Sequence, residues 1–419
     1  MSPRAPCATD RWPGSGENTL VVGQFSDSFP PSIDGVAVVV VNYAEWITRK
    51  YGTACVVAPR EPEPPNYIEN FSFPTIRYTS VPIPGPLPYR LGLPKLDPNL
   101  NRALSDVPFD VVHAHSPFSC GMLAYRLARG RGIPIIATMH SQYRVDFEKW
   151  IRPDWLVEKA IRRIVRFYES VDEVWVPNEA TSRILRSYGF RGETVVQPNG
   201  TDLLPPACGE AQVLRHEGRR LTGVPEDADV VLYVGQHRRE KNVHLVISAL
   251  AELRKHGCRK LYGVFVGSGP ELGELKALAE RSSLNGHAVF TGIVSSRARM
   301  RSLYASSDLL AFPSAYDTDG IVIREAAGFR LPAVVAHSTS SASLVRDAEN
   351  GVTCDQTVES VATAIHRLVD DPVLRDRLGS RARETLYQSF EPVADMAWAR
   401  YLTAVGRSLS TSRSGRAEG

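Results

Sequence analysis

The sequence has 419 residues, of which 43% are hydrophobic and 23% are charged. At roughly 100–200 residues per domain, this length predicts two domains, and the ordinary apolar content excludes a chain that is disordered throughout. The 49 Lys and Arg residues nearly balance the 46 Asp and Glu residues, and the resulting formal net charge of +3 argues against a nucleic-acid-binding protein.

The sequence contains no stretch of about 20 consecutive apolar residues, so we predict no membrane-spanning helix. Its first 18 residues lack the apolar core of a secretory signal. The six cysteines are far apart and form no C-x-x-C pair, which favours reduced thiols over a zinc site or a disulfide framework. We therefore expect a cytoplasmic protein.

Short runs rich in β-branched residues alternate with amphipathic stretches along the first half of the chain. The lead-in, residues 1–18, is rich in Pro, Gly and small polar residues, and we expect it to be disordered. The predicted strands are Leu20–Gly23, Ala54–Ala58, Val111–His113, Ile135–Thr138 and Glu173–Val176. The predicted helices include Gly35–Lys50, Gly121–Arg131, Trp155–Ser170 and Glu179–Tyr188. The valines of Gly35–Lys50 favour a strand, but its apolar residues recur at helical spacing.

The second half repeats this rhythm and ends in a predicted disordered tail, residues 408–419. Its predicted strands are Val230–Val234, Tyr262–Val266, Ala288–Thr291, Leu309–Phe312 and Ala333–Ala336. Its predicted helices are Asn242–Lys255, Pro270–Ala279, Ser296–Ser306 and Ile321–Phe329, followed by an amphipathic helix over Pro392–Val405. Strands that alternate with helices in this way form parallel sheets. We predict two doubly wound α/β domains, 19–204 and 205–391, divided within a Pro- and Gly-rich stretch.

Polar loops follow three of the second-half strands, where open parallel sheets bind their ligands. After Phe312 the loop carries Asp317 and Gly320, and Glu325 lies about one turn into the next helix. Free N–H groups at that helix start favour an anion, and carboxylates accept hydrogen bonds from sugar hydroxyls. The competing interpretation is that Asp317 and Asp319 only cap the helix.

A cationic loop follows Val234, and a glycine turn follows Val266. The first contains Arg238, Arg239 and Lys241, which could hold a diphosphate or form a solvated basic turn. The second contains Gly267, for which nucleotide approach and plain turn geometry are both open. Neither this turn nor the loop after the first strand completes G-x-G-x-x-G, which disfavours a nicotinamide-dependent dehydrogenase.

Two histidines occupy corresponding places in the first half. His115 follows the strand that ends at His113, and His140 follows the strand at 135–138. A lone histidine more often has a structural role. Two histidines at the carboxyl ends of neighbouring strands are equally consistent with a structural role and with a binding crevice.

Together these segments resemble glycosyltransferase family 4, the retaining, nucleotide-sugar-dependent enzymes with the GT-B fold of two facing Rossmann-like domains. The resemblance covers roughly residues 19–405. Its strongest segment is Phe312–Gly328, where Asp317 and Glu325 match the family's two acids separated by seven residues. Supporting segments are Y-V-G-x(4)-E-K-N (Tyr233–Asn242), V-G-S-G-P-E (Val266–Glu271), F-T-G-I-V-S (Phe290–Ser295), L-Y-A-S-S-D-L-L (Leu303–Leu310), S-F-P-P-S-I-D-G-V-A (Ser28–Ala37), H-A-H-S-P-F (His113–Phe118), T-M-H-S (Thr138–Ser141) and Q-P-N-G-T-D (Gln197–Asp202).

The resemblance implies roles for these residues. Glu325 would bind the ribose hydroxyls, Asp317 the donor sugar and Lys241 the diphosphate, and His140 would lie beside the transferred sugar. The other implied donor-binding residues are Gly35, Arg238, Arg239, Gly267, Gly320, Ile321 and Val322. The implied acceptor region contains Asp34, His115 and Tyr143. The final helix, 392–407, would pack back on the first domain.

The sequence departs from the family pattern at two positions. Asp317 replaces the usual Glu, and Gln236 replaces a common Arg of the phosphate loop. The second departure shifts the cationic role to Arg238, Arg239 and Lys241.

The resemblance predicts transfer of a hexosyl group from a nucleoside-diphosphate sugar to a hydroxyl of a glycan, lipid-linked or small-molecule acceptor. It also implies independence of metal ions and no cofactor, with UDP-sugars favoured and GDP-mannose next. A nucleotide-sugar 2-epimerase of the same fold and a non-catalytic nucleotide-sugar-binding protein remain alternatives.

Residues 121–168 carry ten Lys and Arg against four Asp and Glu, a balance of +6. This segment could attach peripherally to the inner face of an anionic membrane or be a solvated helix face.

Overall fold

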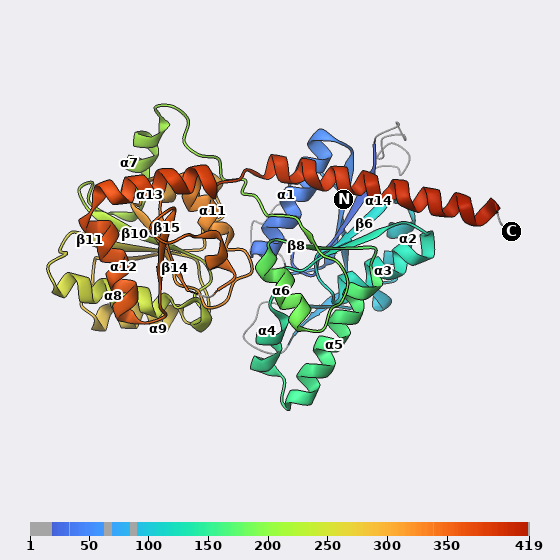
Figure 1. Cartoon of the computed structure of the whole chain (residues 1–419), viewed down its shortest axis with the longest axis horizontal. Helices are drawn as coiled ribbons and strands as arrows, with labels where there is room; N and C mark the ends of the chain where they lie inside the picture. Colours follow the sequence, from blue (N-terminus) through green and yellow to red (C-terminus); the bar gives the residue numbers. More distant parts are fainter. Residues whose placement is uncertain (1–18, 33, 63–68, 84–89, 338, 418–419) are drawn as a thin grey trace, which may run out of the picture. The chain divides into compact units, whose positions relative to one another are not determined.

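The computed structural model describes residues 19–417 apart from 33, 63–68, 84–89 and 338. The chain divides into two compact units, which Figure 1 colours along the sequence. Unit 1 comprises the residues up to Asn199 together with those from Phe390 onward, and unit 2 comprises Gly200–Ser389. The predicted disorder of residues 1–18 lies outside the described residues.

Unit 1 is built on a seven-stranded parallel sheet in the order β3-β2-β1-β6-β7-β8-β9. Its strands are β1 (Val21–Phe25), β2 (Thr53–Pro59), β3 (Thr75–Tyr78), β6 (Val111–Ala114), β7 (Ile135–Thr138), β8 (Glu173–Val176) and β9 (Val195–Val196). A small antiparallel pair, β4 (Ser80–Pro82) and β5 (Arg90–Gly92), lies beside it. The central strands are buried on both faces, which is why they are almost entirely apolar in sequence.

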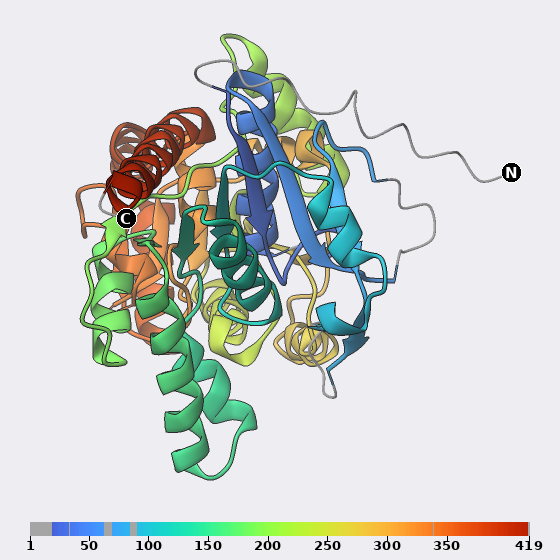
Figure 2. The same ribbon diagram turned by 90° about the vertical axis from the view of Figure 1, so that its right-hand side faces the viewer.

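The helices of unit 1 include the valine-rich segment predicted as a helix. They are α1 (Gly35–Lys50), α2 (Leu100–Ser105), α3 (Ser119–Arg131), α4 (Tyr143–Trp150), α5 (Asp154–Ser170), α6 (Glu179–Ser187) and α14 (Phe390–Ala417), with a short 3-10 turn η1 (Pro94–Leu96). Asp34 caps α1, because its side chain accepts a hydrogen bond from the Ala37 N–H at 2.8 Å. The α4–α5 hairpin projects from the rest of unit 1 (Figure 2).

Unit 2 contains a six-stranded parallel sheet in the order β12-β11-β10-β13-β14-β15. Its strands are β10 (Asp229–Val234), β11 (Leu261–Val266), β12 (Ala288–Gly292), β13 (Leu309–Phe312), β14 (Ala333–Ala336) and β15 (Gly351–Cys354). Its helical elements are α7 (Glu210–Thr222), η2 (Arg239–Lys241), α8 (Val243–Lys255), α9 (Leu272–Arg281), α10 (Arg297–Ala305), α11 (Ile321–Gly328), η3 (Ser341–Leu344), α12 (Val358–Asp370) and α13 (Pro372–Thr385).

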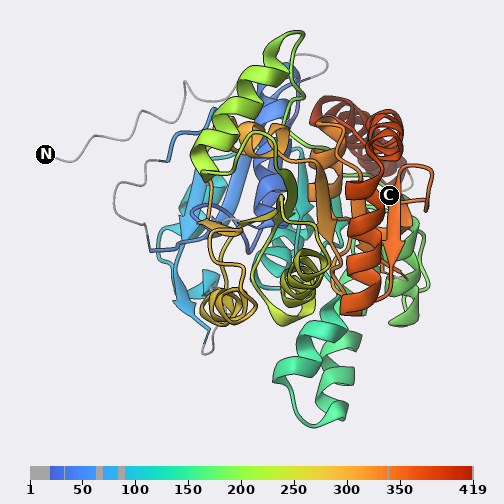
Figure 3. The ribbon, with the colours of Figure 1, turned by 90° about the vertical axis from the view of Figure 1, so that its left-hand side faces the viewer.

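The order of these strands reverses between β10 and β13, so right-handed crossovers place helices on both faces of the sheet. On one face of the sheet, α8 packs with α9 and α12 (Figure 3). Two further pairs of helices are in contact: α7 packs with α10, and α11 packs with α13. The sheet of each unit thus has the Rossmann-like architecture predicted from the sequence. In the part of the chain that the structure describes, no helix is both long and apolar enough to cross a bilayer.

The units divide earlier than the predicted boundary after residue 204. The residues just past Asn199 belong to unit 2, because the Thr201 N–H donates to the Gln388 carbonyl and Leu203 is fully buried in the core of unit 2. The last helix begins at Phe390, before the predicted 392, and continues to Ala417. The segment 408–417 is therefore helical, whereas we expected a disordered tail, since its Ser- and Arg-containing sequence has no proline to stop the helix.

Helix α14 packs against unit 1, where its apolar side meets α1. The Trp398 ring stacks on Tyr51 with centroids 4.9 Å apart and planes inclined by 8°. Tyr51 and Lys50 also bond to the Asp395 carboxylate. This helix therefore completes the core of unit 1 although it lies far from the other elements of that unit in sequence.

Trp398→Ala should lower the stability of unit 1 by about 3–5 kcal/mol, because it removes a large aromatic side chain that is only 6% exposed. Urea unfolding followed by far-UV circular dichroism measures the change. Met396→Ala on the same helix is the control, since Met396 is 43% exposed and its loss should cost no more than about 0.5 kcal/mol. Equal effects of the two substitutions would contradict the packing described here.

Candidate functional site

The loop between β13 and α11 ends at a glycine in a left-handed conformation. Gly320 has φ 62° and is the N-cap of α11, so no side chain at that position covers the N–H groups of Ile321 and Val322. A Cβ at Gly320 would also lie 3.1 Å from the Ser341 side chain. Asp319, which we considered as a cap, is buried and forms an ion pair with Arg324 at 3.6 Å. The N–H groups at the start of this helix, where Ile321 and Val322 are half-buried, can therefore receive an anion.

Lys241 and Asp317 form an ion pair, which joins the cationic loop after β10 to the loop after β13. The Lys241 Nζ lies 2.6 Å from Asp317 Oδ2 and 2.8 Å from the Tyr316 carbonyl oxygen. Both side chains are largely buried. We predicted both residues as donor-binding but did not predict their pairing, because 76 positions separate them.

The two arginines of the cationic loop differ in their surroundings. The Arg238 side chain is largely buried, and its Nε lies 3.0 Å from Glu240 Oε1, so its charge is already balanced. Arg239 is exposed. Gln236, at the position where the family often has Arg, accepts a hydrogen bond from Arg238 at 3.4 Å.

Gly267 lies where the loop after β11 packs closely against the loop after β10. Gly267 has φ 129°, and a Cβ there would come within 2.0 Å of the Gly235 carbonyl oxygen. The neighbouring backbones are also joined, because the His237 N–H donates to the Ser268 carbonyl at 2.9 Å. Close packing of the two loops therefore requires a glycine here, and the donor-binding role of Gly267 stays a prediction.

Glu325 is a buried carboxylate with partners that the sequence analysis missed. It is 5% exposed, and its Oε2 accepts a hydrogen bond from the Tyr304 hydroxyl at 2.6 Å. The Arg297 Nη1 lies 3.7 Å from Oε1. Arg297 itself binds Asp202 through two hydrogen bonds of 2.7 and 2.6 Å. Asp202 and Tyr304 fall within segments that carry the family resemblance, whereas Arg297 lies in none of them.

Burial and charge act in opposite directions on this carboxylate. Burial raises the pKa of Glu325 above its usual value, while the Arg297 charge and the Tyr304 hydrogen bond lower it. Of the two contacts that lower the pKa of Glu325, the Arg297 charge has the larger effect. Arg297 therefore supports the ionised form of Glu325, which is the form that accepts hydrogen bonds from hydroxyls.

In unit 1 the structure brings two predicted residues together. His115 Nδ1 lies 3.0 Å from His140 Nε2, and both rings are buried. Burial lowers the pKa of His140 to about 4 and that of His115 well below its usual value, so both rings are neutral at pH 7.

The other predicted residues of unit 1 have structural partners. Asp34 caps α1 and also accepts a hydrogen bond from Ser28 at 2.6 Å. Gly35 is the first residue of that helix. Tyr143 is buried, and its hydroxyl lies 3.1 Å from that of Tyr168.

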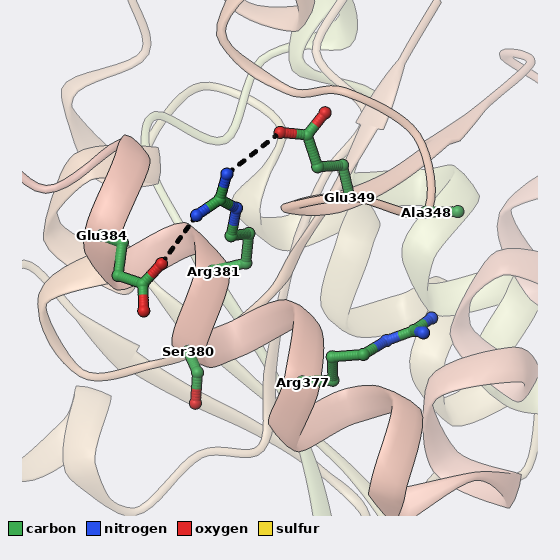
Figure 4. Close-up of a pocket in the computed structure, with 6 residues that line it drawn as sticks. All are labelled: Ala348, Glu349, Arg377, Ser380, Arg381 and Glu384. Carbon is green, nitrogen blue, oxygen red and sulfur yellow. Dashed lines mark hydrogen bonds and ion pairs between the residues drawn. The ribbon is translucent and has the colours of Figure 1, made fainter.

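A surface depression on unit 2 contains none of the predicted site residues. Ala348, Glu349, Arg377, Ser380, Arg381 and Glu384 line it (Figure 4). The Arg381 guanidinium lies 2.8 Å from Glu384 and 3.8 Å from Glu349, so its charge is balanced by neighbouring carboxylates. Within the described residues, no three His, Cys, Asp or Glu side chains are grouped as metal ligands.

Comparison with known proteins assigns this chain to a family. The family model described as Glycosyltransferase Family 4 matches residues 33–203, and the model described as Glycosyl transferases group 1 matches residues 215–385. An alpha-D-kanosaminyltransferase of Streptomyces kanamyceticus is 30% identical over 285 residues, which are 65% of this chain and 71% of that protein. The chain belongs to glycosyltransferase family 4.

Two further proteins are similar to this family 4 glycosyltransferase. An alpha-monoglucosyldiacylglycerol synthase of Streptococcus pneumoniae is 27% identical over 322 residues, 75% of this chain and 70% of that protein. The structure of Anabaena HepE in complex with UDP and glucose matches with a TM-score of 0.73 at 19% identity, covering 92% of this chain and 99% of that one. The fold is therefore GT-B, and the protein is a glycosyltransferase.

Arg297→Met in this glycosyltransferase should raise the pKa of Glu325 further, because the nearest cation is removed while the burial remains. Carboxyl-carbon NMR of the folded protein, titrated from acid to neutral pH, measures the midpoint. Arg299→Met is the matched control, since Arg299 is exposed on the same helix. A Glu325 midpoint that is the same in both variants would show that Arg297 does not support this carboxylate.

Proposed function

We propose that this enzyme transfers a hexosyl group from a nucleoside-diphosphate sugar to an acceptor hydroxyl with retention of the anomeric configuration. The observation that carries the proposal is the Lys241–Asp317 pair beside the uncapped start of α11, within a family 4 chain. A cation, a carboxylate and open N–H groups at one sheet edge suit a ligand that combines phosphates with hydroxyls.

In the proposed reaction the bond between the anomeric carbon and the diphosphate oxygen breaks, and the acceptor oxygen bonds to the same carbon. The diphosphate departs with the bond's electron pair and takes up the proton of the acceptor hydroxyl. Because negative charge grows on the leaving group, preorganised cations and N–H groups supply most of the catalysis. We assign this task to Lys241, Arg239 and the N–H groups of Ile321 and Val322.

The remaining assignments follow from the chemistry of each group. Glu325 accepts hydrogen bonds from the ribose hydroxyls through its ionised carboxylate, and Asp317 contacts the donor sugar. We propose that no metal ion or other cofactor is required, because Lys241 and Arg239 offset the diphosphate charge. Among donors we favour UDP-sugars, since HepE, a structural relative, binds UDP, and we place GDP-mannose next.

Lys241→Ala should lower turnover on the order of 10²-fold or more, because one charge-stabilising donor is lost at the leaving group. Turnover is measured as nucleoside diphosphate released, after a thermal-shift panel of UDP-, GDP- and ADP-sugars has identified the donor. Lys255→Ala, at an exposed position of α8, is the control and should retain activity. Near-normal turnover of the Lys241 variant would refute the assignment.

The same assay separates the alternatives. Sugar epimerised in the absence of any acceptor would indicate a 2-epimerase, and donor binding without release of diphosphate under every acceptor would indicate a binding protein. An anomer-resolved NMR spectrum of the product that showed inversion would overturn the retaining mechanism.

We further propose that the α4–α5 hairpin attaches the enzyme to an anionic membrane, as a lipid-linked acceptor would require. The supporting observation is one exposed stripe on α5 at helical spacing, formed by Trp155, Lys159, Arg162, Arg163 and Arg166. Trp155 is 61% exposed, whereas Phe167 on the same helix is buried. A basic helix face with an exposed aromatic ring suits a lipid surface.

Arg162→Glu with Arg163→Glu should abolish co-sedimentation with anionic vesicles at low salt, because the double substitution lowers the charge of the stripe from +4 to zero. Arg183→Glu with Arg186→Glu is the matched control, since these exposed arginines lie on α6. The absence of wild-type binding to such vesicles would end the membrane proposal and leave the transferase proposal intact.

A further inference from the structure

The β4–β5 hairpin of unit 1 carries apolar side chains that point away from the rest of the protein. In an ordinary antiparallel pair the apolar side chains face the core and the polar ones face water. Here the cross-strand partners Val81 and Leu91 are 40% and 48% exposed, and Ile83, two residues after Val81, is 44% exposed. We call these three residues the hairpin patch. Leu96, in the η1 turn that follows the hairpin, is 68% exposed.

The opposite face of the hairpin explains why these side chains point outward. Gly92 is buried, and a Cβ there would lie 2.4 Å from Ser119 Oγ and 2.5 Å from the Tyr78 hydroxyl oxygen. This face therefore packs against unit 1 so closely that only a glycine fits. Because successive side chains of a strand point to opposite sides, the same packing directs Leu91 and its partner Val81 outward.

The residues around the hairpin patch carry a positive balance of charge. Arg77, Arg90 and Lys95 stand against one carboxylate, Asp97, over residues 75–83 and 90–97, so three cations less one anion leave +2. Lys95 is exposed, and so is Arg60, whose carbonyl oxygen accepts a hydrogen bond from a serine of β4. Exposed aliphatic groups bordered by cations suit the interface of an anionic bilayer.

The hairpin patch lies at the same end of unit 1 as the basic stripe of α5. Strand β4 follows the carboxyl end of β3, and the α4–α5 hairpin follows the carboxyl end of β7. Because β3 and β7 belong to one parallel sheet, the segments that follow them leave the sheet at the same edge. Figure 2 shows both hairpins extending from that end of unit 1. A single lipid surface can therefore contact both.

We propose that the β4–β5 hairpin inserts the hairpin patch into the interfacial region of an anionic bilayer, as a second membrane contact beside the α5 stripe. This inference rests on the membrane attachment proposed above and does not depend on the sugar donor. Binding to a bilayer grows with both the apolar area buried and the attraction to anionic lipids. The patch supplies the first and the stripe the second.

A second copy of the chain is a poorer occupant of the hairpin patch than a bilayer. A stable protein interface takes roughly 20–30 residues a side, whereas the patch consists of three aliphatic residues. The cores of protein interfaces are also rich in aromatic side chains, and none belongs to the patch. A bilayer has no such requirement, because a few aliphatic side chains enter it independently of one another.

Val81→Thr with Leu91→Thr should weaken binding to vesicles of phosphatidylglycerol and phosphatidylcholine roughly tenfold, because two aliphatic side chains no longer enter the lipid. Threonine keeps the β-branched preference of a strand, so the hairpin should remain folded. Co-sedimentation over a range of lipid concentrations measures the binding. Val213→Thr with Leu221→Thr is the matched control, since these exposed residues lie on α7 of unit 2, and it should bind as the wild-type protein does.

Salt separates this apolar contact from the charged contact of α5. Ions screen the attraction between basic side chains and anionic lipid, but they do not weaken the transfer of apolar groups out of water. The hairpin variant should therefore show the same defect at low and at moderate salt, whereas the defect of Arg162→Glu with Arg163→Glu should shrink as salt is added. A hairpin defect that vanished with salt would overturn insertion.

Circular dichroism checks that the double variant is folded, and Ile83→Thr repeats the test outside the paired residues with a loss of roughly threefold. Equal binding of these variants and the wild-type protein would refute the inference and leave the α5 stripe as the membrane contact. If the wild-type protein bound no vesicles, the membrane attachment would fail with it, and the transferase proposal would stand. A dimer in sedimentation velocity that the Val81 and Leu91 variant lost would assign the patch to a second copy instead.

Discussion

The parallel pairing of the strands is the constraint on which both candidate sites depend. Because all strands of a parallel sheet end at the same edge, the loops after β10, β11 and β13 gather in unit 2 although 76 residues separate Lys241 from Asp317. The same rule gathers Gln24, His115 and His140 in unit 1. Few of the predicted site residues lie on the strands themselves. Because the apolar strands are buried, the edge of the sheet is rigid, and the short loops that follow can hold polar groups in positions suited to bind a ligand.

The two units stabilise their buried polar groups in different ways. In unit 2 a charged carboxylate, Glu325, is stabilised by Arg297, whose own charge is balanced by Asp202. In unit 1 the buried histidines stay neutral, and His115 bonds to Gln24 through one ring nitrogen and to His140 through the other. A charged network makes a strong hydrogen-bond acceptor, whereas a neutral network fixes the direction of its side chains without adding charge.

Sequence patterns predicted those features that depend on local residues. The strand Leu309–Phe312 and the helix Gly35–Lys50 have the predicted bounds, because turn residues flank one and apolar residues at helical spacing define the other. Partners brought together by the fold were not predictable, and Arg297 beside Glu325 is the clearest case. Gly267 shows the same limit, since only the fold reveals that the Gly235 carbonyl occupies the space a side chain would need.

The Asp that replaces the family's usual Glu at position 317 forms an ion pair with Lys241. The shorter side chain still reaches Nζ at 2.6 Å, so the pair is neutral before any donor binds. On the proposed function, a diphosphate that approached Lys241 would compete with Asp317 for the same cation, and Asp317 would then accept a sugar hydroxyl as the cation turned toward phosphate. The proposed function would thereby couple binding of the phosphates to recognition of the sugar through one lysine, which would favour a complete nucleotide sugar over either of its parts.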